Sequence, residues 1–64
     1  MIHNNLHNLM TQMTTESKSL WRIKNHYVKD AEESPEAQTF WKKMIEDKEA
    51  HIKELKELIK KELE

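Results

Sequence analysis

The sequence predicts an all-α protein, an antiparallel helical hairpin that dimerises into a four-helix bundle, with residues 1–64 as its single domain. Three observations predict this fold. The 64-residue chain has no glycine and one proline, which lies near its middle. Apolar residues recur at alternating three- and four-residue steps on both sides of that proline, as in coiled-coil-like packing. A second set of apolar residues flanks the first, and one hairpin cannot cover both sets.

The first predicted helix spans about residues 5–32. Its apolar row consists of Leu6, Leu9, Met13, Leu20, Ile23 and Tyr27. The adjacent threonines Thr14 and Thr15 have low helix propensity and mark the weakest place in this segment, but we expect one continuous helix. The helix should end shortly before Pro35, because the residue before a proline is biased away from helical geometry.

The second predicted helix spans about residues 35–62 and follows a turn at residues 33–34. Ser34 can cap a free backbone N–H, and Pro35 is tolerated at the first helical position, where its missing N–H costs no hydrogen bond. The apolar row of this helix consists of Trp41, Ile45, Ile52, Leu55 and Ile59. In an antiparallel hairpin that turns at Ser34, the numbers of facing residues should add up to about 68, so Tyr27 should face Trp41.

Six further apolar residues form the predicted interface between two hairpins: Met10, Trp21, Val28, Phe40, Met44 and Leu58. Burial of one large apolar side chain contributes about 1.5–3 kcal/mol, so several together can drive formation of a homodimer. Two alternatives remain open. The chain can be a monomer with scattered exposed apolar residues, or an adaptor that presents this face to the helix of another protein.

Two charged residues interrupt the apolar rows, Glu16 in the first helix and Lys48 in the second. An inward-pointing carboxylate needs a partner, because an unpaired buried charge is costly. Pairing of Glu16 with Lys48 or with His51 would fix the register of the bundle. The alternative is a metal site formed by Glu16, Asp47 and His51, for iron or another divalent ion.

A family resemblance bears on that alternative. The residues that carry it run from Glu16 through Trp21, Tyr27 and Ala31, then through Ser34-Pro35-Glu36-Ala37 and Phe40 to Leu58. This pattern resembles half of a ferritin-like or rubrerythrin-like bundle. The resemblance implies that Glu16 and His51 hold iron at a dimer interface. The family's Glu-x-x-His pair is incomplete here, since Lys48 stands three residues before His51 and Asp47 would have to substitute.

Composition excludes several classes of function. Without cysteine, the chain has no disulfides or thiolate metal sites. A net charge of −1 with no basic face does not predict nucleic-acid binding. No stretch reaches the ~20 apolar residues of a membrane span, and the N-terminus lacks the pattern of a secretory signal, so we expect a cytoplasmic protein. No catalytic constellation is recognisable. We therefore expect a protein-interaction or assembly module, with a ferritin-like iron protein as the alternative.

Overall fold

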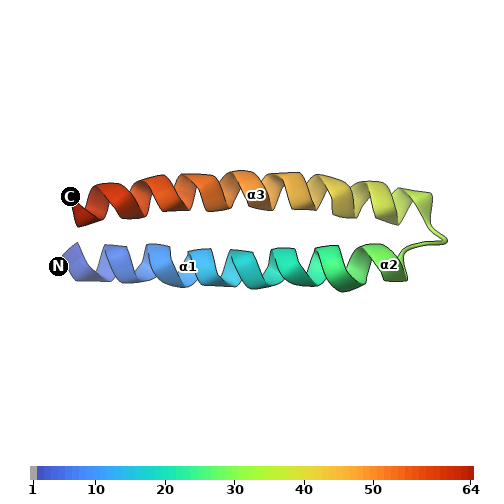
Figure 1. Ribbon diagram of the computed structural model, residues 1–64, viewed down its shortest axis with the longest axis horizontal. Coiled ribbons are helices and arrows are strands. Elements are labelled where there is room, and N and C mark those ends of the chain that lie inside the picture. Colours follow the sequence, from blue (N-terminus) through green and yellow to red (C-terminus); the bar gives the residue numbers. More distant parts are fainter. Residues whose placement is uncertain (1) are drawn as a thin grey trace.

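The protein is all-helical over the part of the chain that the structure describes (Figure 1). The computed structural model describes the backbone of residues 2–64 and the side chains of residues 4–64. Its elements are α1 (Ile2–Arg22), the π-helical segment η1 (Ile23–Tyr27), α2 (Val28–Asp30) and α3 (Pro35–Leu63). The first three form one continuous arm and α3 forms the other. The arms lie side by side, both chain ends are at the same end, and the molecule measures 48 × 14 × 13 Å.

The turn between the arms is built by local hydrogen bonds. Ser34 has extended backbone angles, and its hydroxyl accepts a hydrogen bond from the Ala37 N–H at 3.3 Å. Pro35 follows as the first residue of α3, where its fixed φ suits a helix start. The first arm ends at Asp30, two residues before the expected end. The Ser34 N–H donates to the Ala31 carbonyl at 2.9 Å, and this bond closes a turn instead of extending the helix.

The helix continues without a break through Thr14 and Thr15. The hydroxyl of Thr14 donates to the Met10 carbonyl, and that of Thr15 to the Thr11 carbonyl, both at 3.1 Å. Each hydroxyl therefore donates to a carbonyl one turn earlier in the same helix, so neither threonine caps the start of a new helix.

The irregularity in the first arm lies instead at Ile23–Tyr27, which forms a π-helical segment. Sequence reasoning missed it, although the spacing of apolar residues contained a signal. Val28 follows Ile23 by five residues, a step that the wider π-helical turn accommodates and an α-helical turn does not. After this turn Val28 and Ala31 are partly buried while Asp30 stays exposed. The π segment thus keeps a carboxylate out of the contact between the arms.

Contacts between the arms follow the expected register. The rings of Tyr27 and Trp41 lie 5.1 Å apart between centroids, which confirms that predicted pair. At the other end of the molecule, Asn5 donates a hydrogen bond to Glu62. The packed centre is small. Among the described side chains Ile23 alone is fully buried, at 1% exposure, and the other members of the two apolar rows are only partly covered.

Within residues 2–64, no helix combines the length and the apolar composition that crossing a membrane requires.

Candidate functional site

The centre of the molecule holds an ion pair between the arms. Lys48 of α3 donates from Nζ to Oε2 of Glu16 of α1, at 2.7 Å. Both side chains are largely withdrawn from water, with 13% of Glu16 and 16% of Lys48 exposed. The predicted pairing of the two charged residues that interrupt the apolar rows is therefore confirmed.

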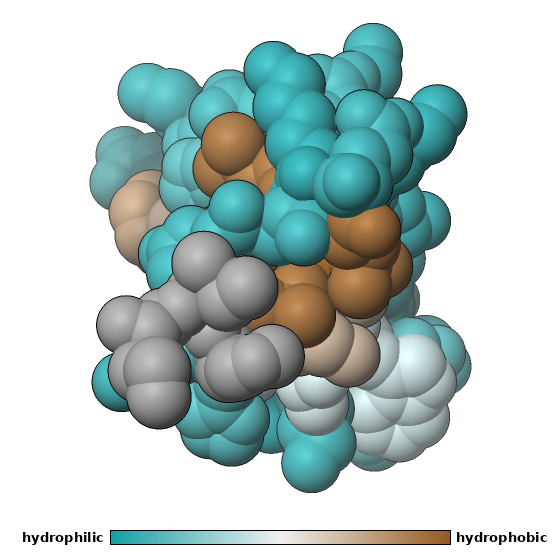
Figure 2. Space-filling view, turned by 90° about the vertical axis from the view of Figure 1, so that its left-hand side faces the viewer, coloured by the Kyte–Doolittle hydropathy of each residue, from teal (hydrophilic) through white to brown (hydrophobic). Residues whose placement is uncertain are grey.

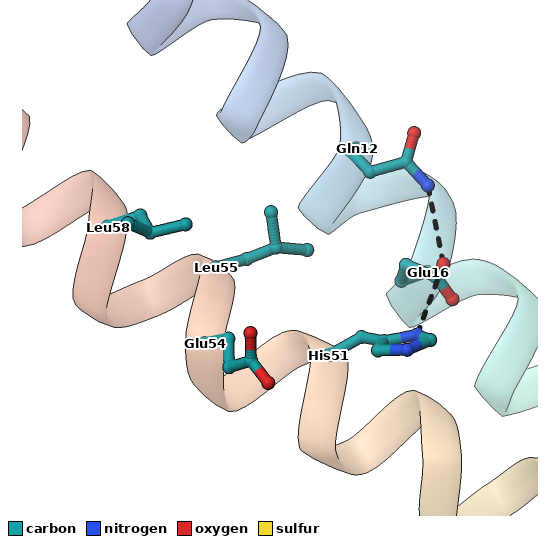
Figure 3. A pocket seen from close by; sticks show the side chains of 6 residues that line it. All are labelled: Gln12, Glu16, His51, Glu54, Leu55 and Leu58. Carbon is teal, nitrogen blue, oxygen red and sulfur yellow. Dashed lines mark hydrogen bonds and ion pairs between the residues drawn. The ribbon is translucent and has the colours of Figure 1, made fainter.

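Two further side chains approach the second carboxylate oxygen of Glu16 (Figure 3). Gln12, one turn earlier in α1, donates from Nε2 to Oε1 at 3.3 Å. The ring of His51 points toward Glu16 from α3, with its Nδ1 3.9 Å from Oε1. His51 is itself 59% exposed, so it lies at the rim of this cluster. The carboxylate thus faces Lys48, Gln12 and His51 at once.

These neighbours shift the acidity of Glu16. The hydrogen bond from Lys48 is the main cause that holds the pKa of the Glu16 carboxyl below its ordinary value of 4.5. Withdrawal from water opposes this shift, while the charge of Lys48, the Gln12 hydrogen bond and the nearby His51 add to it. The ionised form of Glu16 is therefore stabilised in the folded state.

The lowered pKa of Glu16 predicts a pH-dependent contribution to stability. This contribution is fully present above the unfolded-state pKa, near 4.5, and is lost as the pH falls through the lower folded-state pKa. Glu16→Gln should reduce the free energy of unfolding at pH 7 by about 1.5–3 kcal/mol, the usual worth of a hydrogen bond to a charged group. Below pH 4.5 the difference between variant and wild type should shrink.

Urea denaturation of both proteins between pH 2.5 and 7 measures this difference. Other carboxylates titrate in both proteins, so the difference between the two curves isolates Glu16. A difference that is independent of pH would contradict the assignment.

An open groove lies beside the ion pair, between α1 and α3. Its volume is about 290 Å³, and Gln12, Glu16, His51, Glu54, Leu55 and Leu58 line it. Figure 3 shows that Leu55 and Leu58 point from α3 toward α1, while His51 and Glu16 meet at one end of the groove. The groove is therefore apolar at Leu55 and Leu58 and polar at the end where Glu16 and His51 meet, and Gln12 and Glu54 also belong to its lining. We call the face of the molecule that carries it the groove side.

The predicted metal site is only partly assembled within one chain. Glu16 and His51 come together, but among the described residues no three His, Cys, Asp or Glu side chains gather as a metal site. Asp47 therefore does not complete a triad with Glu16 and His51 of its own chain. Lys48 also occupies Oε2 of Glu16, so a metal ion could bind both carboxylate oxygens only by displacing Lys48.

The six predicted interface residues do not share one face. Leu58 and His51 both line the groove. Met44 precedes His51 by one heptad and so lies on the same face of α3, which places Met44 and Leu58 on the groove side. Phe40 is one turn before Met44 on the same side. On the opposite face, Lys24 donates a hydrogen bond from Nζ to Oε2 of Glu49 at 3.1 Å. Met10 precedes Lys24 by two heptads, so it lies on that opposite face as well.

We call this opposite face the Lys24–Glu49 side. It also carries Trp21, three residues before Lys24 on the helix. Val28 lies on neither face, because the π segment turns it partly toward α3. The end-on view in Figure 2 shows hydrophobic surface at several places around the molecule, between hydrophilic side chains. The second apolar set is thus divided between two faces, which the sequence pattern did not reveal.

Comparison with protein-family models, with curated proteins and with solved structures found no match to this chain.

Proposed function

We propose that this chain is a self-associating helical hairpin, two copies of which form a four-helix bundle, and that it works as an assembly or interaction module. The observation that carries the proposal is the large accessible surface. One chain exposes 5271 Å². A compact monomer of 7.8 kDa exposes about 4400 Å², so the excess is roughly 900 Å². Each partner in a standard protein interface buries about 800 Å².

The small packed centre supports the same conclusion. One fully buried side chain among those described is a weak core for a chain of this length. Large apolar side chains meanwhile remain exposed: Phe40 at 54% and Leu58 at 45%. Covering them with a second hairpin would give the chain the core that it lacks alone.

Charge selects the groove side as the face that associates. Along the groove side α3 carries three acidic or lysine residues: Asp47, Glu54 and Lys61. Along the Lys24–Glu49 side it carries six: Lys42, Glu46, Glu49, Lys53, Lys56 and Lys60. The centres of protein interfaces are depleted in charge, because each buried charge must be desolvated. The groove side fits that description better, and it leaves Met10 and Trp21 outside the interface.

Native mass spectrometry, combined with sedimentation velocity at several concentrations, tests the proposal. Protein purified without chelator or affinity-tag metal should give a metal-free dimer that dissociates on dilution. A folded monomer at all concentrations would overturn self-association, and the adaptor alternative would then gain support. A dimer that carries a fixed number of iron or other divalent ions would favour the ferritin-like alternative.

A further inference from the structure

The groove side of α3 has a regular pattern of its own. The positions of α3 that face the groove side follow one another at alternating three- and four-residue steps over most of the helix. This is the spacing of a coiled-coil seam, a second one beside the row that packs on α1. The members that matter here are Ala37, Phe40, Asp47, His51, Leu58 and Lys61. Phe40 and Leu58 are exposed and apolar, while Asp47 carries a carboxylate and His51 an imidazole that can donate a hydrogen bond to it. No helix within residues 2–64 covers the exposed parts of Phe40 and Leu58 in this seam.

We propose that the occupant of this seam is α3 of a second copy, packed antiparallel about a two-fold axis that crosses the groove side at the level of Glu49. This inference rests on the proposed self-association and specifies its geometry. In this arrangement the numbers of facing residues add up to about 98, as antiparallel heptad layers require. Phe40 packs on the partner's Leu58, and His51 faces the partner's Asp47. Because a two-fold interface is reciprocal, each contact occurs twice.

Complementarity singles out this register. In the next antiparallel register one heptad away, Leu58 falls over the partner's Asp47, and Phe40 lies beyond the end of the facing helix. In the register one heptad away in the other direction, Phe40 falls over the partner's His51. In a parallel arrangement Asp47 faces its own copy, and like charges in direct opposition are destabilising. The register centred at the level of Glu49 alone combines Phe40 on Leu58 with Asp47 against His51, and it places Met44 over the partner's Glu54.

The first arm is compatible with this arrangement. On the groove side, at the level of the proposed axis, α1 carries Thr15 and Ser19, which are small and uncharged. Small side chains permit the close approach of two helices, and Arg22, three residues after Ser19 on the same side, keeps its charged end in water at the edge of the contact. The α1 arms of the two copies can therefore pack together over the same axis.

The second copy also completes the cluster at the end of the groove. Within one chain His51 lies 3.9 Å from Glu16 but is 59% exposed. The partner's Asp47 would cover this exposed ring and offer an acceptor to its free nitrogen. The Glu16–Lys48–His51 cluster thus becomes a polar layer that crosses the dimer. Such a layer fixes one register among several apolar alternatives.

Cysteine cross-linking tests the geometry directly, because the natural chain has no cysteine. Ala37 and Lys61 face each other between copies in the proposed register. Within one chain they are 24 residues apart on one helix, a distance of roughly 36 Å, so they cannot bridge intramolecularly. The double variant Ala37→Cys/Lys61→Cys should oxidise to a covalent dimer with two disulfides, visible by non-reducing electrophoresis and by mass.

Matched variants separate the outcomes. Each single variant should stay uncross-linked, whereas an equimolar mixture of the two should give a dimer with one disulfide. Ala37→Cys/Lys60→Cys, which moves one thiol about 100° around the helix, should cross-link at least tenfold more slowly. Circular dichroism confirms that each variant is helical.

Four results would overturn the proposed geometry. Single variants that cross-link by themselves would show a parallel pair, and a ladder of covalent polymers would show a head-to-tail contact. A dimer in sedimentation that the double variant fails to lock would show another register or face, with self-association intact. A monomer in sedimentation would remove the proposed function and this inference together.

Discussion

Replacing Ile23 by alanine is expected to destabilise the protein by about 2–5 kcal/mol, the usual cost of truncating a fully buried isoleucine. Ile23 is 1% exposed and is the one fully buried side chain among those described. It also begins the π segment, so its contacts position the turn that brings Val28 and Ala31 toward α3. Since small domains have little stability to spare, this single change should leave the chain largely unfolded at 37 °C.

Thermal and urea denaturation, followed by circular dichroism at one fixed protein concentration, measures the effect. The concentration must be held constant because the proposed association would contribute to apparent stability. Ile59→Ala is the matched control, since it removes the same atoms from a partly exposed position in α3. Its cost should be clearly smaller. Equal losses for the two variants would show that burial is not concentrated at Ile23.

Leu58→Glu is expected to weaken the proposed dimerisation by about one to two orders of magnitude. About half of Leu58 is already covered within one chain, so the change removes the remaining burial of two leucines per dimer, about 0.7–1.5 kcal/mol each, and each 1.4 kcal/mol corresponds to a tenfold change in the dissociation constant. It also brings a carboxylate into the interface without a partner. Leu58 is 45% exposed in the single chain, so a glutamate there should not disturb the hairpin itself.

Met10→Glu is the control for that experiment. Met10 has nearly the same exposure, 48%, and lies at the same level of the molecule, but it belongs to the Lys24–Glu49 side. Its substitution should change the dissociation constant by less than about threefold, as expected for an exposed helix position. Sedimentation equilibrium reports both constants. The reverse ranking would move the interface to the Lys24–Glu49 side.

Much of the helical architecture could be predicted from local patterns. Ser34 and Pro35 are a cap and a helix start whose chemistry depends on neighbouring residues alone, and the Ser34 hydroxyl forms the expected bond. The pairing of Glu16 with Lys48 was one of two pairings that the sequence predicted, and the other was with His51. Glu16 and Lys48 each interrupt an otherwise apolar row, and the antiparallel register brings the two within one turn of each other.

The sequence by itself determined that the chain is helical, where α3 begins and that Glu16 lies close in level to Lys48 and His51, because each depends on spacing along one helix or on one register. The tertiary structure decided three further features. It placed the π segment at Ile23–Tyr27, where π-helical hydrogen bonds replace α-helical ones and Val28 and Ala31 become partly buried. It assigned the exposed apolar residues to two opposite faces. It also left His51 at an open groove beside Glu16. Faces and grooves depend on how two helices rotate against each other, and a helical period within one arm carries no record of that rotation.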